Sequence, residues 1–133
     1  MQIHFYKYHG TGNDFILIDN RKQIINKTNA DWVKKLCHRR FGIGADGLML
    51  LKSSADYDFE MEYYNLDGSG GTMCGNGGRC ISAFAKHLGI ISEKGQFLAS
   101  DGLHEVYIDK NELVKLKMMS VNKIEENDEY SFL

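Results

Sequence analysis

The chain has 133 residues, of which 43% are hydrophobic and 26% charged, and its formal net charge is -2. This balance is that of one ordinary globular domain, and the small net charge argues against binding to nucleic acid or to an anionic membrane surface. No apolar run approaches the roughly 20 residues that a membrane-spanning helix needs. The opening MQIHFYKYHG lacks the features of a signal peptide, so we expect a cytoplasmic protein with reduced thiols at Cys37, Cys74 and Cys80.

Two strands are predicted at the start of the chain. In the first, residues 3–10, the apolar Ile3 and Phe5 alternate with polar neighbours. The second, Asp14–Asp19, is a short apolar run typical of a buried strand. The turn between them, in the stretch HGTGNDF, is rich in glycine and asparagine.

A helix is expected to begin near Thr28, because the spacing from Thr28 to Asp31 resembles a capping box. Its apolar face repeats at helical spacing. That face consists of Trp32, Val33, Leu36 and Cys37. Arg39 and Arg40 suit the negative C-terminal end of this helix.

The middle of the chain predicts two strands and a second helix. A strand at Leu48–Leu51 follows a glycine-rich loop, and the alternation in Tyr57–Asn65 predicts a strand with one buried and one wet face. The segment Arg79–Leu88 is apolar at almost every angle around a helix, which is typical of a buried helix. Gly89 is suited to end that helix.

Three more strands are predicted after this helix. They are QFLAS, LHEVYID and LVKLKMM, with hairpin turns at Asp101-Gly102 and Lys110-Asn111. The order of elements favours an α+β fold, in which a strongly curved, mostly antiparallel, barrel-like sheet wraps around the central buried helix 79–88.

The stretch MCGNGGRC holds two cysteines, Cys74 and Cys80, around a glycine-rich turn. Five residues separate them, which does not fit a zinc knuckle, and no paired Cys or His follows. The stretch also lacks the lysine and hydroxyl residue of a phosphate-binding P-loop. Cys80 falls on the apolar side of the predicted helix and is interpreted as a core residue.

Cys74 precedes the helix, where the positive end of the helix dipole favours a thiolate. The glycines after it let a ligand approach the backbone closely. N–H donors could then hold an anionic group while the sulfur reaches the neighbouring carbon, a layout for proton abstraction next to a carboxylate or for nucleophilic attack. An inert, partly buried thiol is the alternative.

Asparagines stand beside glycines in three separate turns, at Asn13, Asn65 and Asn76. Each amide can be explained by turn chemistry alone. If the turns met at one end of the sheet, their amides and backbone N–H groups would suit a polar ligand with a carboxylate and an amine.

Four blocks in order, HGTGNDF, RRFGIGADGL, YYNLDGSGGTMCGNGGRC and the three-strand tail, resemble the N-terminal half of diaminopimelate epimerase. The resemblance covers nearly the whole chain. It implies an isomerase that interconverts LL- and meso-diaminopimelate for lysine and peptidoglycan precursors, with no pyridoxal phosphate and no metal. It also implies two similar lobes, each supplying one cysteine to a cleft between them.

By the same resemblance, the catalytic cysteine of the first lobe falls on Cys74, which acts as thiolate base. The substrate-binding asparagines fall on Asn13 and Asn65, and the backbone at Gly75 and Asn76 holds a carboxylate. Some members carry a substrate-contacting glutamine where this chain has Gly47, so no role is carried over to that position.

On this reading residues 1–120 form the N-terminal lobe and 121–133 begin a linker toward a second lobe. Because epimerisation by two bases needs groups on opposite faces of one carbon, we expect little activity from the chain alone. A homodimer or a complementing second lobe could supply the other face. The alternatives are a related cofactor-independent racemase or isomerase and a non-catalytic module that binds small anions.

Overall fold

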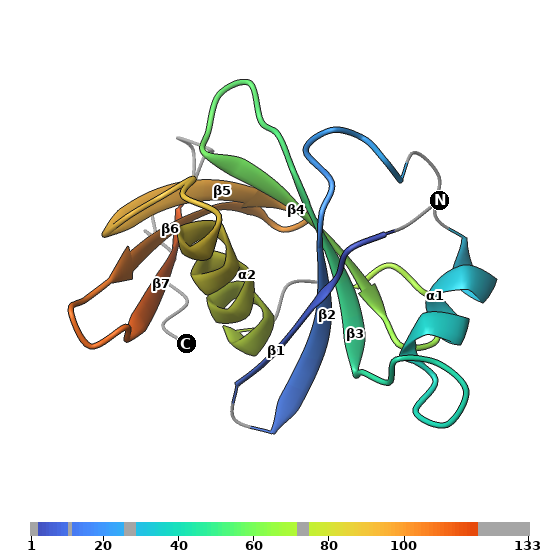
Figure 1. Cartoon of the computed structure of the whole chain (residues 1–133). Helices are drawn as coiled ribbons and strands as arrows, with labels where there is room; N and C mark the ends of the chain where they lie inside the picture. The colour runs from blue at the N-terminus through green and yellow to red at the C-terminus, as the bar shows by residue number, and fades with distance from the viewer. Residues whose placement is uncertain (1–2, 11, 26–28, 72–74, 120–133) are drawn as a thin grey trace.

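The computed structural model describes residues 3–10, 12–25, 29–71 and 75–119. In this part of the chain seven strands form one curved sheet, and two helices pack on it (Figure 1). The first elements are β1 (Tyr6–Gly10), β2 (Asn13–Asp19), α1 (Ala30–Cys37), β3 (Gly47–Lys52) and β4 (Phe59–Asn65). They are followed by α2 (Gly75–His87), β5 (Lys94–Ala99), β6 (Gly102–Ile108) and β7 (Val114–Met119).

The strands lie in the sheet in chain order, from β1 at one edge to β7 at the other. Four of the neighbouring pairs are antiparallel, whereas β2–β3 and β4–β5 are parallel. The β4–β5 pairing is short and joins only Phe59 to Phe97 and Glu60 to Leu98. The predicted curved, mostly antiparallel sheet around a central helix is therefore confirmed.

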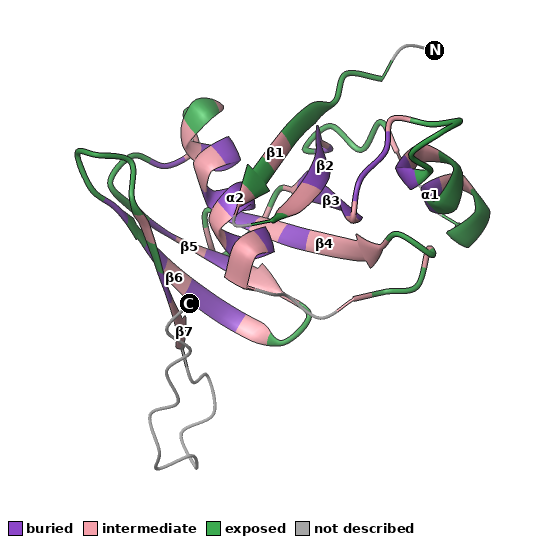
Figure 2. Cartoon of the chain, turned by 90° about the horizontal axis from the view of Figure 1, so that it is seen from below, coloured by how far each residue is buried: buried purple, intermediate pink, exposed green. Residues whose placement is uncertain are grey.

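Strands β2 and β3 are buried on both faces, which explains their continuous apolar sequences (Figure 2). On the concave face, α2 packs into the larger core through Ile81 and Phe84. The sheet residues of that core include Phe15, Leu17, Met49, Leu51, Phe59, Met61, Phe97 and Val106. On the convex face, Val33 and Cys37 of α1 pack against a smaller core of Ile16, Ile18, Ala45, Leu48 and Leu50.

Helix α1 begins at Ala30, and its N-cap is Asn29, whose side chain accepts a hydrogen bond from the N–H of Trp32 at 2.8 Å. Asparagine is among the strongest N-cap residues, so it takes the role that the spacing assigned to Thr28, a residue outside the described ranges. The apolar face of the helix is as predicted, with Trp32 and Leu36 packed partly buried against the smaller core.

Helix α2 begins at Gly75, four residues before the predicted start at Arg79. Glycine has a low helix propensity, which is why the run from Gly75 to Gly78 reads as a turn in the sequence. Packing overrides that preference, since Gly77 and Gly78 are buried within the helix. The predicted C-terminal end is confirmed by Gly89, which has φ +81° and donates to the Lys86 carbonyl at 3.0 Å.

Strand β1 differs from the prediction in its start and in its inward face. Ile3 and Phe5 lie before the strand and are 36% and 44% exposed. The residues of β1 that face α2 are instead Tyr6 and Tyr8, whose rings lie 5.0 and 5.8 Å from that of Phe84, although Tyr6 at the strand start is still 37% exposed. The inward set is thus shifted by one residue, because aromatic contact with the helix outweighs the apolar character of Ile3 and Phe5.

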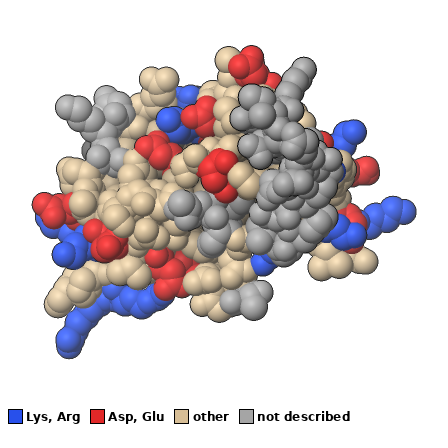
Figure 3. Space-filling model, turned by 180° about the vertical axis from the view of Figure 1, so that it is seen from behind, with Lys and Arg blue, Asp and Glu red and all other residues tan. Residues whose placement is uncertain are grey.

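Charged side chains of both signs are interspersed over the face of the molecule opposite to that in Figure 1 (Figure 3). No helix among the described residues is long and apolar enough to cross a membrane.

Candidate active site

The predicted site residues that the structure describes lie at one end of the sheet. Asn13 is the first residue of β2, Asn65 the last of β4, and Gly75 and Asn76 open α2. Across the strands, Asn65 is opposite Gly47, and Gly47 is opposite Phe15, two residues beyond Asn13. The three asparagine-bearing turns therefore converge at the start of β2 and β3, on the side where α2 begins.

Asn13 and Asn76 are in direct contact, although 63 residues separate them in the sequence. The Nδ2 group of Asn76 donates to Oδ1 of Asn13 at 2.8 Å. Asn13 directly follows the turn of the β1–β2 hairpin, and the packing of α2 into the concave core brings Asn76 into contact with it. The positive end of the α2 dipole is directed at the same place.

A group of charged side chains supports the Asn13 end of β2. Nδ2 of Asn13 donates to Oδ2 of Asp46 at 3.2 Å, and the backbone N–H of Asp14 donates to the same oxygen at 3.1 Å. Arg39 donates to both oxygens of Asp14, at 3.0 and 2.8 Å, and to Oδ1 of Asp46 at 3.1 Å. The hydrogen bonds from Arg39, and then the one from Lys7 at 2.9 Å, hold the pKa of Asp14 well below its usual range.

Arg79, one turn into α2, donates a hydrogen bond to Oδ1 of Asn76. It also lines a hollow of about 510 Å³ between β1, α2 and the β6–β7 connection, together with Gly10 and Cys80. Another hollow, of about 620 Å³, lies toward the opposite end of β2 and is lined by Ile18, Asp19 and Arg21. We place the candidate site by its converging polar groups rather than by the size of a hollow.

Asn65 is placed at the same end of the sheet, but its described hydrogen bonds stay within its own turn. Its Nδ2 group donates to Oγ of Ser69 at 3.1 Å, and its backbone N–H donates to the Ser69 carbonyl at 2.8 Å. Turn chemistry therefore accounts for these bonds, whereas the contact between Asn13 and Asn76 is a tertiary one.

The ring of Tyr63 explains why this chain has glycine at position 47. A Cβ atom on Gly47 would lie 2.7 Å from Cε1 of Tyr63, and one on Gly71 would lie 2.5 Å from its Cδ2 and Cε2. The ring therefore occupies the space beside both glycines, and it meets Phe15 edge-on at 6.0 Å. The Tyr63 ring occupies the space beside the site into which a longer side chain at position 47 would extend.

Cys74, the predicted base, lies outside the described residues. The next residue, Gly75, begins α2. Cys80 is buried in the larger core, as predicted, and Cys37 is buried in the smaller one, where burial raises the pKa of its thiol. Within the described ranges, no three His, Cys, Asp or Glu side chains gather in a way that would hold a metal ion.

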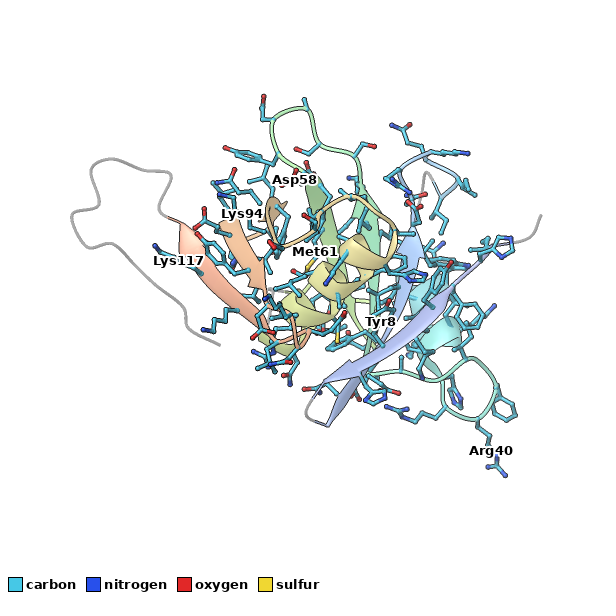
Figure 4. The ribbon with its side chains drawn as sticks, turned by 60° about the vertical axis from the view of Figure 1, so that its left-hand side comes forward. Tyr8, Arg40, Asp58, Met61, Lys94 and Lys117 are labelled. Atoms are coloured by element: carbon cyan, nitrogen blue, oxygen red, sulfur yellow. The ribbon has the colours of Figure 1, made fainter. Side chains whose placement is uncertain are left out.

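The sequence reasoning missed three residues of this site: Arg39, Asp46 and Arg79. Arg39 had been assigned to the end of α1, but its partners are the two carboxylates at the start of β2 and β3. Arg40, its neighbour, projects from the loop after α1 into solvent (Figure 4). The only signal was the position of Arg39 and Asp46 within the motif RRFGIGADGL, since their pairing depends on how the loop folds.

Solved structures with a similar fold include two proteins with low sequence identity. A hydroxyproline epimerase from Agrobacterium vitis matches with a TM-score of 0.60 and 12% identity, over 86% of this chain and 40% of its own. A phenazine biosynthesis protein of the PhzF family from Bacillus anthracis matches with a TM-score of 0.58 and 15% identity, over 87% of this chain and 38% of its own. These matches establish the fold.

Sequence relatives are much closer. A diaminopimelate epimerase from Flavobacterium psychrophilum is 57% identical over 96% of this chain and 50% of its own length. One from Chlorobaculum tepidum is 48% identical over 83% of this chain and 43% of its own. The chain thus spans about half the length of these relatives. The profile of the family described as diaminopimelate epimerase matches residues 5–125. The chain belongs to the diaminopimelate epimerase family.

Proposed function

We propose that this chain forms the N-terminal lobe of a diaminopimelate epimerase that interconverts the LL and meso forms without pyridoxal phosphate or a metal ion. Residues 1–120 are the lobe, and 121–133 lead toward a second lobe. The observation that carries the proposal is the 2.8 Å hydrogen bond between Asn76 and Asn13, which gathers the start of α2 and the start of β2 into one polar site. Family membership supplies the substrate.

The proposed reaction is a proton exchange at the α-carbon of an amino acid. The Cys74 thiolate takes the α-proton, so that the C–H bond breaks, an S–H bond forms, and the electron pair of the C–H bond spreads into the carboxylate. N–H donors aimed at the carboxylate stabilise this charge. The first turn of α2 and the amides of Asn13 and Asn76 are suited to that task.

Inversion also needs an acid on the opposite face of the carbon, and Cys74 serves one face only. We therefore expect no appreciable epimerisation by the 133-residue chain as a monomer. A second lobe with its own cysteine, or a second copy of the chain placed across the substrate, would supply the other group.

The direct test is to incubate the chain with LL-diaminopimelate and follow the meso product, with the oligomeric state measured by sedimentation in the same buffer. We expect no turnover by the monomer. Turnover should appear when the C-terminal half of the Flavobacterium psychrophilum relative is added. Robust turnover by the monomer alone would overturn the one-base assignment.

A second test measures the alkylation rate of Cys74 against pH, with a Cys74→Ser variant to identify its signal. The buried Cys37 and Cys80 should react slowly and serve as internal references. We expect Cys74 to ionise below roughly 8.5, because a helix N-terminus favours the thiolate. An ordinary profile, no faster than that of Cys37, would favour a module that binds anions without chemistry.

A further inference from the structure

The contacts of the site form a continuous chain of side chains. We call this series of hydrogen-bonded side chains the amide relay, and it consists of Arg79, Asn76, Asn13 and Asp46. Arg79 donates to Oδ1 of Asn76, Nδ2 of Asn76 donates to Oδ1 of Asn13, and Nδ2 of Asn13 donates to Oδ2 of Asp46. The four residues come from the start of α2, the start of β2 and the loop that leads into β3.

The two ends of the relay fix the orientation of both amides. A guanidinium can only donate, so Arg79 requires the oxygen of Asn76 to face it, which turns Nδ2 of Asn76 toward Asn13. An ionised carboxylate can only accept, so Asp46 requires Nδ2 of Asn13 to face it, which turns Oδ1 toward Asn76. The two requirements agree, and every donor in the relay points the same way.

A carboxamide can rotate by half a turn with little change in shape, so its orientation is decided by its partners. In the relay both amide oxygens already accept a hydrogen bond. Each Nδ2 group has two protons, and the relay uses one of them. Among the described residues no acceptor takes the second proton of either group, so Asn13 and Asn76 together offer N–H donors to an anionic oxygen.

We propose that Asp46 and Arg79 are positioning residues, which act through Asn13 and Asn76 to set this pair as a donor surface for a substrate carboxylate. The ligand assignment rests on the proposed function, whereas the relay itself does not. Arg39 supports the Asp46 end, since it donates to Oδ1, while Oδ2 accepts from Asn13 and from the Asp14 N–H. Charged ends also strengthen the hydrogen bonds between them.

The test reads the side-chain NH2 signals of Asn13 and Asn76 by NMR in the chain without ligand. In the wild type, one proton of each group donates within the relay, so the chemical-shift difference between the two protons of each group should exceed that of a solvent-exposed asparagine. Asp46→Ala should reduce this difference at Asn13, its neighbour, and also at Asn76, which Asp46 does not touch. The matched control is Asp19→Ala, at the other end of β2, which should leave both signals unchanged.

The same test can be made from the opposite end of the relay. Arg79→Met should change the NH2 signals of Asn76 and also those of Asn13, which Arg79 does not touch. Its control is Lys86→Met on the same helix, where the lysine pairs with Glu112 at 3.5 Å. If each variant changes only its immediate neighbour, the contacts are independent pairs and the relay is disproved.

The Asp46→Asn variant separates a loss of amide orientation at Asn13 and Asn76 from a loss of overall protein stability. An asparagine at position 46 keeps an acceptor for Asn13, so both amide signals should return most of the way to those of the wild type. Failure of this variant to restore them, with the backbone spectrum intact, would contradict a positioning role. It also keeps the test open if Asp46→Ala does not fold.

Titration with meso-diaminopimelate then tests the ligand. We expect Asp46→Ala to bind about tenfold more weakly than the wild type, the loss typical of one well-oriented hydrogen bond, and Asp46→Asn to recover most of the affinity. Equal affinity for wild type and Asp46→Ala would overturn the positioning role. If the wild type binds nothing, the proposed substrate of this lobe fails, whereas the spectra without ligand still decide whether the relay exists.

Discussion

The two ends of β2 carry the same residue types and use them differently. An asparagine and an aspartate are adjacent at each end, Asn13 with Asp14 at the start of the strand and Asp19, its last residue, with Asn20 directly after it. At the far end the side-chain partners are local, since the Asp19 carboxylate binds Arg21 and the Asn20 amide binds the backbone of Ile25. At the site end Lys7 is a nearby partner of Asp14, but the other side-chain partners come from distant segments: Arg39 lies 25 residues from Asp14, and Asp46 and Asn76 lie 33 and 63 residues from Asn13.

This difference shows what each end does. The local pairs close a loop and would form wherever that short sequence folded. The distant pairs hold the start of β2 against β3 and α2, so they require the whole fold. Polar groups held in this way keep a fixed orientation in a half-exposed position, which is what a binding site needs.

The strongest way to separate the two ends is Asn20→Ala. Asn20 is 4% exposed, and its side-chain amide makes two hydrogen bonds with the backbone of Ile25: Nδ2 donates to the carbonyl at 2.7 Å, and Oδ1 accepts from the N–H at 2.8 Å. Losing both should lower the free energy of unfolding by about 2 kcal/mol or more. Asn13→Ala, in the half-buried site, should cost less stability but change the Asn76 NH2 signals. Urea denaturation checks the first result, and equal losses for the two variants would contradict the contrast.

The site end should also be less tolerant of added volume, because the ring of Tyr63 fills it. Gly71→Ala would place Cβ 2.5 Å from that ring and should destabilise the protein by about 1 to 3 kcal/mol. Gly70→Ala is the matched control, since its Cβ would meet nothing within 4 Å. Thermal unfolding of the two variants gives the measurement. A loss for Gly70→Ala as large as that for Gly71→Ala would show that backbone effects, and not Tyr63, are responsible.

A smaller difference is expected between Asp14→Asn and Asp19→Asn. Among the described residues Asp14 pairs with two cations, Arg39 at 2.8 Å and Lys7 at 2.9 Å, whereas Asp19 pairs with one, Arg21 at 2.8 Å. We expect a loss of about 1 kcal/mol for Asp14→Asn and under about 0.5 kcal/mol for Asp19→Asn. Urea denaturation in low and high salt should show the difference and its screening. Identical losses would mean that distant and local pairs contribute alike.

The smallest expected effect is the dependence of the Asp14 contribution on pH. Its folded pKa is lowered, chiefly by the Arg39 hydrogen bonds, so its stabilisation is fully present above the unfolded value of about 3.9. It is lost as the pH falls through the folded pKa. The advantage of wild type over Asp14→Asn should therefore shrink between about pH 4 and pH 2. An advantage that grows on acidification would reverse the sign and refute the cause.

Much of the fold was predictable because apolar periodicity depends on local sequence. The seven strands, the apolar face of α1 and the glycine end of α2 follow from spacing alone. The prediction was wrong where tertiary contacts overrode local preference. Packing extends α2 through the glycines 75–78, and the ring of Phe84 selects Tyr6 and Tyr8 as the inward residues of β1.

The candidate site was predictable in its asparagines but not in its charges. Asn13 and Asn76 stand beside glycines in turns, a signal that sequence displays directly. The roles of Asp46 and Arg79 depend on which carboxylate and which cation reach those amides. That depends on the packing of α2 against the β1–β2 hairpin, which no local pattern encodes. Cys74 stays a prediction, because it lies outside the described residues.

The short pairing between β4 and β5 divides the sheet into two parts, β1–β4 and β5–β7, which are joined by a ladder of two residue pairs. This short ladder is reinforced by the stacked rings of Phe59 and Phe97, 4.8 Å apart, and by two hydrogen bonds between Asp58 and Gln96. Helix α2 packs against residues of both parts of the sheet and so connects them across this short ladder. A ligand bound at the first turn of that helix would therefore stabilise both parts of the sheet.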